Sequence, residues 1–226
     1  MAGETMASSS DRLTPLQRAL LETFFRLESR FFLTGGAALA GYYLYHRSTL
    51  DIDLFTLDPV AFETGRRALE TAAAELGATL AVRQHAPGFE RCVVTGSGES
   101  VVVDLVLERV PQTSGAKHLI GSITVDPIEE IFVNKLNTLL SRAEERDLVD
   151  LLFLERHGLR MEDGLRAALE KDGGCTPAAL AWVLAEVSIP DAVALPGGVT
   201  AAELRQFVAG LVVRLRRAAF PTSPGV

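Results

Sequence analysis

The sequence predicts an α+β fold in which a mixed β-sheet flanked by helices precedes a mostly helical C-terminal region. Strand-like apolar runs occur only within residues 1–126, whereas helical periodicity fills the chain from Gly158 onward. Thr or Asp followed by Pro, a pattern typical of helix starts, occurs at four places: Thr14-Pro15, Asp58-Pro59, Asp126-Pro127 and Thr176-Pro177. We therefore expect a sheet-containing core over residues 1–126 and a helical region over residues 127–226.

The elements are expected in the following order. A helix begins at Thr14-Pro15, where Leu16, Leu20 and Phe24 recur at helical spacing. Strands are expected at Phe31–Thr34, Asp51–Thr56, Ala78–Arg83, Arg91–Thr95, Val101–Leu107 and Ser122–Val125. Helices are expected at Ala37–Tyr45, Pro59–Leu76, Met161–Lys171, Pro177–Val187 and Thr200–Ala219. Another helix is expected to begin at the cap Asp126-Pro127. Trp182 is expected in the core. The glycines at Gly96-Ser97-Gly98 predict a hairpin between two of the strands.

Composition limits the class of protein. The chain has 226 residues, of which 48% are hydrophobic, so it is long and apolar enough to form a folded core. No run approaches the length of a membrane span, and Met1–Ser10 lacks the features of a signal peptide. Cys92 and Cys175 are far apart in sequence, which favours a reduced, cytoplasmic protein. The net charge of −7 argues against broad, nonspecific nucleic-acid binding, although a local basic groove remains compatible with it.

The most informative stretch runs from residue 31 to residue 56. Gly35-Gly36 follows a short strand, and a turn without side chains lets a phosphate approach backbone amides at the start of the next helix. Asp51 and Asp53 lie on the next strand, where alternation directs both carboxylates to the same face. A divalent cation would relieve the repulsion between them. Taken singly, a solvated strand end and an ordinary turn would explain these motifs, but their combination favours a nucleotide and metal site.

Further charged residues lie in apolar surroundings. Asp104 interrupts a nearly continuous apolar strand, so it either faces solvent or adds a third carboxylate to the first two. Three such groups hold two Mg²⁺ ions in many phosphoryl-transfer sites. Lys135 either extends toward a triphosphate or reaches solvent. Asp147 and Asp150 share one helix face, where they position Lys135 or an arginine, act as a base, or form an ordinary surface ion pair.

Together these motifs resemble the AbiEii/AbiGii-type nucleotidyltransferase family, the toxins of bacterial toxin–antitoxin and abortive-infection systems, which includes the MenT-type toxins. The broader resemblance is to the DNA polymerase β-like nucleotidyltransferase fold. The resemblance spans about Phe31 to Leu154, and its motifs keep their order along the chain. It is carried by these segments: Leu33–Leu39, His46-Arg47, Thr49, Asp51–Phe55, Lys135-Leu136 and Arg146–Leu151.

The resemblance implies transfer of a nucleoside monophosphate from an NTP to an acceptor, with release of pyrophosphate. It assigns Asp51, Asp53 and Asp104 to metal binding and catalysis, with Mg²⁺ or Mn²⁺ as the cofactor. It assigns nucleotide contacts to Gly35, Gly36, Arg47, Thr49 and Lys135. Lys135 and Asp147 also join the catalytic set. In MenT-type relatives the acceptor is the end of tRNA, so RNA is the expected acceptor here, and an antitoxin protein is a further expected partner.

Two other functions are compatible with the same residues. The first is a nucleotidyltransferase that modifies a small molecule such as an antibiotic, since an acidic protein suits a cationic acceptor. The second is a nucleotide-binding or partner-binding protein that keeps the fold without catalysis. Three clustered carboxylates argue against the second, because a protein without catalysis has no need of them.

Overall fold

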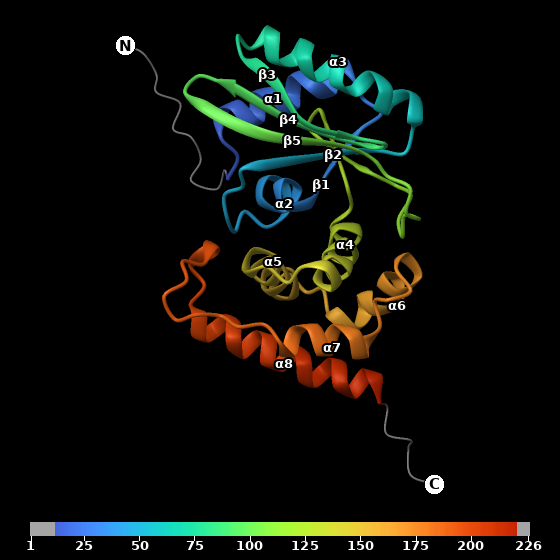
Figure 1. Cartoon of the computed structure of the whole chain (residues 1–226), viewed down its shortest axis with the longest axis vertical. Coiled ribbons are helices and arrows are strands. Elements are labelled where there is room, and N and C mark those ends of the chain that lie inside the picture. Colours follow the sequence, from blue (N-terminus) through green and yellow to red (C-terminus); the bar gives the residue numbers. More distant parts are fainter. Residues whose placement is uncertain (1–11, 221–226) are drawn as a thin grey trace. The chain divides into compact units, whose positions relative to one another are not determined.

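The computed structural model describes residues 12–220, so the expectation for Met1–Ser10 lies outside the described residues. The chain divides into two compact units (Figure 1). The first comprises residues up to Arg109 together with Lys117–Asp126, and the second comprises Val110–Ala116 and residues from Pro127 onward. Each unit is described below by itself. None of the described helices is long and apolar enough to cross a membrane.

The first unit is built on a mixed sheet of seven strands within the described residues, with the order β3-β4-β5-β2-β1-β7-β6. Strand β2 pairs with β5 and β1 pairs with β7 in parallel, whereas the other neighbours are antiparallel. The strands are β1 (Phe32–Thr34), β2 (Asp51–Thr56), β3 (Thr79–Ala86), β4 (Phe89–Gly96), β5 (Glu99–Leu107), β6 (His118–Ile120) and β7 (Ile123–Val125). The α+β fold class is confirmed, and β6 is the strand that the sequence pattern did not predict.

Helices cover the two faces of this sheet. Helices α1 (Pro15–Leu27) and α3 (Pro59–Glu75) lie on one face, and the short helix α2 (Gly35–Ala38), continued by the π-helix η1 (Leu39–Tyr43), lies on the other (Figure 1). A capping box at Thr14 begins α1 as predicted. Gly65 of α3 packs tightly, because a Cβ there would lie 2.6 Å from Phe31 Cζ. The same Cβ would lie 3.6 Å from Leu105 Cδ1, an ordinary packing distance, so odd-numbered residues of β5 face α3.

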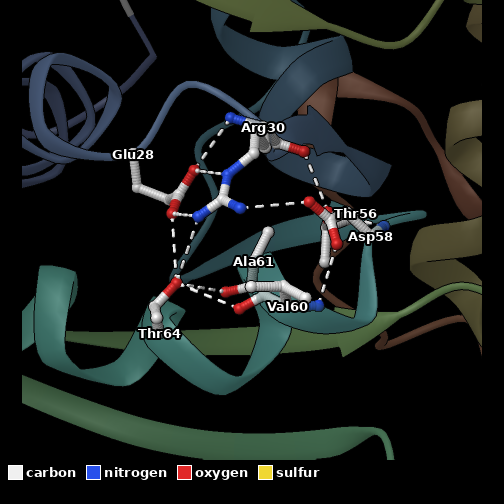
Figure 2. A network of polar contacts seen from close by, with 7 residues as sticks. All are labelled: Glu28, Arg30, Thr56, Asp58, Val60, Ala61 and Thr64. Atoms are coloured by element: carbon white, nitrogen blue, oxygen red, sulfur yellow. Dashed lines mark hydrogen bonds and ion pairs between the residues drawn. The ribbon is translucent and has the colours of Figure 1, made fainter.

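A network of hydrogen bonds and ion pairs connects the segment after β2 with the end of α1 and the start of α3 (Figure 2). Arg30 Nε and Nη2 donate to the two carboxylate oxygens of Glu28 at 2.9 and 2.6 Å, and Arg30 Nη1 donates to Asp58 at 3.1 Å. Asp58 in turn caps α3 by accepting from Val60 N. The hydrogen bonds and the charge of Arg30 hold the pKa of Glu28 below its ordinary value, even though burial opposes this shift. The ionised network therefore links the loops that follow α1 and β2.

The second unit is helical. Its helices are α4 (Ile128–Ser141), α5 (Glu145–Arg156), α6 (Met161–Lys171), α7 (Pro177–Ala185), the 3₁₀-helix η2 (Pro196–Gly198) and α8 (Ala201–Ala219). Helices α4 and α6 pack closely, because a Cβ on Gly164 would lie 2.8 Å from Phe132 Cε1. The buried Glu130 joins Lys171 to the loop residues Thr113 and Ser114, whose backbone amides donate to it. That contact explains why residues 110–116 belong to this unit.

Two sequence expectations are wrong in detail. Asp126 does not cap α4, since Pro127 occupies the cap position without a side-chain hydrogen bond. Its carboxylate instead accepts from Lys117 Nζ at 2.5 Å, a charge-assisted bond in which both groups are ionised. Trp182 is not in the core, because its side of α7 faces away from the buried Leu180, Ala181 and Leu184, and 70% of the residue is exposed.

Candidate functional site

Strand β2 presents its two aspartates on one face, as the alternation predicts. Ile52 and Leu54 are buried, whereas Asp51 and Asp53 are half-buried on the opposite side. Thr49, which precedes the strand, donates its hydroxyl hydrogen to Asp51 Oδ1 at 2.8 Å. The carboxylate of Asp51 is thereby oriented by a neighbouring side chain.

Strand register places Asp53 in a polar row that crosses the sheet. Asp53 pairs with Thr34 of β1 on one side and with Asp104 of β5 on the other. Asp104 pairs in turn with Arg91 of β4. Residues paired directly across neighbouring strands point to the same face, so Arg91, Asp104, Asp53 and Thr34 form a continuous row on the face opposite α3. We call this set the polar row.

Asp104 is held by an arginine within this row. Arg91 Nε donates to Asp104 Oδ1 at 2.8 Å, and Nη2 donates to Oδ2 at 2.6 Å, which is the side-on geometry of a bidentate pair. The hydrogen bonds and charge of Asp104, with smaller contributions from Asp53 and Asp51, raise the pKa of Arg91. Of the two alternatives for Asp104, exposure to solvent is therefore wrong, because its side chain is only 10% exposed. Metal binding by Asp104 stays a prediction.

The Gly35-Gly36 turn lies directly against this carboxylate cluster. Gly35 has a φ of 64°, and a Cβ there would overlap Asp53 Oδ2, so both the backbone conformation and the close approach require glycine. A Cβ on Gly36 would lie 2.6 Å from Arg47 Nη2 and 3.6 Å from Thr49 Oγ1. Arg47 is buried, and its Nη1 donates to the backbone carbonyl of Ser48 at 3.1 Å. The turn, the basic residue and the aspartates thus occupy one place in the first unit.

The other two predicted residues belong to the second unit. Lys135 on α4 is buried, and its Nζ lies 2.7 Å from Asp147 Oδ1 and 2.8 Å from Asp150 Oδ2 on α5. Burial by itself would lower the pKa of Lys135, but attraction by Asp150 and Asp147 outweighs it and raises the pKa. Lys135 therefore does not reach solvent, and the expectation that Asp147 and Asp150 position it is supported. Arg142 Nε, at the end of α4, also lies 3.4 Å from Asp147 Oδ2, but Asp147 is buried, so this contact is not the ordinary surface ion pair of the alternative interpretation.

The first unit thus brings together seven of the predicted site residues: Gly35, Gly36, Arg47, Thr49, Asp51, Asp53 and Asp104. The carboxylate oxygens of Asp51 and Asp53 are the ligand type that Mg²⁺ and Mn²⁺ bind, so the donor set on β2 fits such an ion. Within residues 12–220, no three His, Cys, Asp or Glu side chains gather closely enough to hold a metal ion. In this conformation, Asp104 is the partner of Arg91.

Arg91 is the site residue that the sequence interpretation missed. A signal for it was present, because Gly96-Ser97-Gly98 predicts a tight hairpin. A two-residue loop pairs Gly96 with Glu99, and counting back along both strands places Arg91 opposite Asp104. Only the register of the hairpin, and no local motif, connects the two residues.

The comparisons with known proteins agree with this architecture. The chain is similar to the crystal structure of JHP933 from Helicobacter pylori, with 22% sequence identity, a TM-score of 0.56, and coverage of 89% of this chain and 91% of that chain. A second crystal structure from Helicobacter pylori, described as a candidate nucleotidyltransferase, is 19% identical with a TM-score of 0.56, covering 89% of this chain and 94% of that one. No curated protein sequence matches the chain.

The fold is similar to that of a candidate nucleotidyltransferase of known structure. The family model for the nucleotidyl transferase AbiEii toxin of type IV toxin–antitoxin systems matches residues 18–221. The chain therefore belongs to the AbiEii nucleotidyltransferase toxin family. Membership in this family implies a nucleotide substrate and an antitoxin as partner, and it confirms the resemblance that the sequence motifs indicated.

Proposed function

We propose that the chain transfers a nucleoside monophosphate from an NTP to an RNA acceptor, with tRNA as the expected RNA, and that the reaction depends on Mg²⁺ or Mn²⁺. The observation that carries this proposal is the placement of the Gly35-Gly36 turn against Asp53, with Asp51 on the same face and Asp104 paired beside it. A phosphate-binding turn next to carboxylates of this kind is suited to phosphoryl transfer. NTPs and RNA are cytoplasmic molecules, so the proposal places the activity in the cytoplasm.

The proposed reaction is a substitution at the α-phosphorus of the NTP. The oxygen of an acceptor hydroxyl forms a bond to this phosphorus, the bond to the bridging oxygen breaks, and pyrophosphate leaves. The hydroxyl proton passes to a base, for which the carboxylates of the site are the available groups. When a divalent cation is bound by Asp51 and Asp53, it supplies charge neutralisation at the phosphates and makes the acceptor hydroxyl more acidic.

The remaining residues of the first unit orient the substrate. Backbone amides at Gly35 and Gly36 donate to phosphate oxygens, since the first amides of a helix have no partner within the helix. Arg47 contributes positive charge behind the turn, and Thr49 keeps Asp51 oriented. Most of the rate enhancement then comes from positioning and charge stabilisation. A contact between Lys135 and the triphosphate, and a catalytic role of Asp147, stay predictions.

The test compares wild-type protein with Asp53→Asn in the presence of Mg²⁺, each labelled NTP and total RNA. We expect the wild type to place label on tRNA and Asp53→Asn to lose this activity with its fold intact, as checked by circular dichroism. Asp58→Asn is the matched control. Asn also caps helices, and Asp58 follows the C-terminal end of β2, whereas Asp51 lies at its N-terminal end. It should label RNA as the wild type does.

Other outcomes would change the proposal in defined ways. Full activity in Asp53→Asn would overturn the assignment of the site. Label that appears on a small molecule, and not on RNA, would identify an antibiotic-type nucleotidyltransferase on the same fold. A wild-type protein that binds NTPs without transferring any label would support a nucleotide-binding role.

A further inference from the structure

The pairing of Arg91 with Asp104 has a consequence for the proposed metal site. Both carboxylate oxygens of Asp104 accept hydrogen bonds from the same guanidinium group, at 2.8 and 2.6 Å. A divalent cation binds carboxylates through these same oxygen lone pairs. The guanidinium and a metal ion therefore compete for Asp104.

The exposure of the two side chains shows which of them would move. The Asp104 side chain is 10% exposed and is fixed on a central strand, whereas the Arg91 side chain is 46% exposed on β4. Arg91 is long and flexible, and solvent readily receives its guanidinium. Because Asp104 is largely buried and its bond to Arg91 is bidentate, breaking this pair costs free energy, and a divalent cation that displaces the arginine binds more weakly by that amount.

We propose that Arg91 is a positioning residue, the resident cation of the polar row. It holds Asp104 in line with Asp53 until a divalent cation takes its place. The inference rests on the proposed function, because it assumes that Asp51 and Asp53 bind such a cation. It adds that the third carboxylate joins the site only after it exchanges an arginine for a metal ion.

The test measures the binding of Mn²⁺ to the purified full-length protein, for example by the electron paramagnetic resonance signal of the free ion. Removing the competing cation with Arg91→Met should strengthen Mn²⁺ binding about tenfold or more, since nearby charges interact strongly at such distances. Arg83→Met on β3 is the matched control, because it removes the same charge from an exposed residue outside the polar row. We expect it to change Mn²⁺ affinity by less than about twofold, since solvent screens exposed charges.

A double-mutant cycle separates competition from general electrostatics. In an Asp104→Asn background there is no carboxylate to compete for, so adding Arg91→Met should change Mn²⁺ affinity by no more than about threefold. Arg91→Lys keeps the positive charge and should bind Mn²⁺ within about threefold of the wild type. Circular dichroism of each variant checks that the sheet is intact.

Three results would overturn the inference, and each is distinguishable from the others. If the wild type binds Mn²⁺ in a manner that depends on Asp53, but Arg91→Met binds it equally well, then the role of Arg91 is wrong and the proposed function stands. If neither the wild type nor Arg91→Met binds Mn²⁺, the inference fails together with the metal dependence of the proposed function. Tighter binding by Arg91→Met that persists in the Asp104→Asn background would also contradict competition for Asp104.

Discussion

Gly35 and Asp53 approach each other so closely that a Cβ on Gly35 would overlap the carboxylate of Asp53. The two residues lie on different elements, since Asp53 is in the middle of β2 and Gly35 begins α2. No side chain of Gly35 separates the Asp53 carboxylate from the backbone of the glycine turn. A ligand bound by Asp53 is therefore next to that backbone. This contact connects the phosphate-binding and metal-binding parts of the proposed site.

Replacing Gly35 with Ala should damage function more than stability. The left-handed conformation at a φ of 64° costs a residue with a side chain about 1–2 kcal/mol, and the new methyl group must also push Asp53 away. Because small displacements of reacting groups are costly, transfer activity should fall about 100-fold. Gly121→Ala is the matched control, since Gly121 has a φ of 63° with no atom within 4 Å of a Cβ built there. Denaturant unfolding should show at least as much destabilisation in Gly35→Ala as in Gly121→Ala, and the NTP labelling assay should show lost activity only in Gly35→Ala. Equal activities would show that the close approach has no functional importance.

The Glu28–Arg30 network should make stability depend on pH. The hydrogen bonds from Arg30 lower the pKa of Glu28 in the folded state, so its contribution is fully present above the unfolded value of 4.5 and is lost as the pH falls through the folded value. Glu28→Gln should lower the free energy of unfolding by about 2 kcal/mol at pH 7. Between pH 7 and low pH, the wild type should lose more stability than the variant does.

Urea unfolding at a series of pH values measures both effects. Glu63→Gln, on the exposed side of α3, is the control and should change stability by less than about 0.5 kcal/mol. Parallel stability curves for the wild type and Glu28→Gln would contradict the assigned pKa shift.

Lys135 should be more important for stability than either carboxylate that it contacts. Lys135→Met leaves Asp147 and Asp150 buried without their shared cation, which should cost about 3 kcal/mol or more. Asp147→Asn keeps the pair of Lys135 with Asp150 and should cost about 1 kcal/mol. Unfolding monitored by circular dichroism orders the variants, and adding Asp150→Asn to Lys135→Met should recover part of the loss. A Lys135→Met protein as stable as the wild type would refute this account of the cluster.

Local patterns predicted the features that depend on neighbouring residues. The Thr14, Asp58 and Thr176 caps, the alternation that directs Asp51 and Asp53 to one face, and the hairpin at Gly96-Ser97-Gly98 are all present. Each of these needs only residues a few positions apart. The Asp104 side chain was expected to find either solvent or a partner, and the apolar strand around it was the correct indication of burial.

Features that depend on distant residues were not predicted. Asp126 lies in a sequence that is typical of a helix cap, but its carboxylate pairs with Lys117. No motif near either residue indicates this ion pair. Trp182 lies in a segment that is apolar on every side, so periodicity could not identify the face of α7 that is buried. The involvement of Arg91 with Asp104 follows from hairpin register, which requires counting across two strands.

The position of β5 in the sheet also affects when the site becomes complete during synthesis. Strand β5 lies between β4 and β2, and its parallel pairing with β2 requires the chain to pass through α3, β3 and β4 first. Parallel pairing between segments so far apart is slow and non-local. A nascent chain that has emerged from the ribosome only as far as β4 carries Gly35, Asp51 and Asp53 but has no Asp104 beside them. We therefore expect polypeptides that end before β5 to lack the proposed transferase activity.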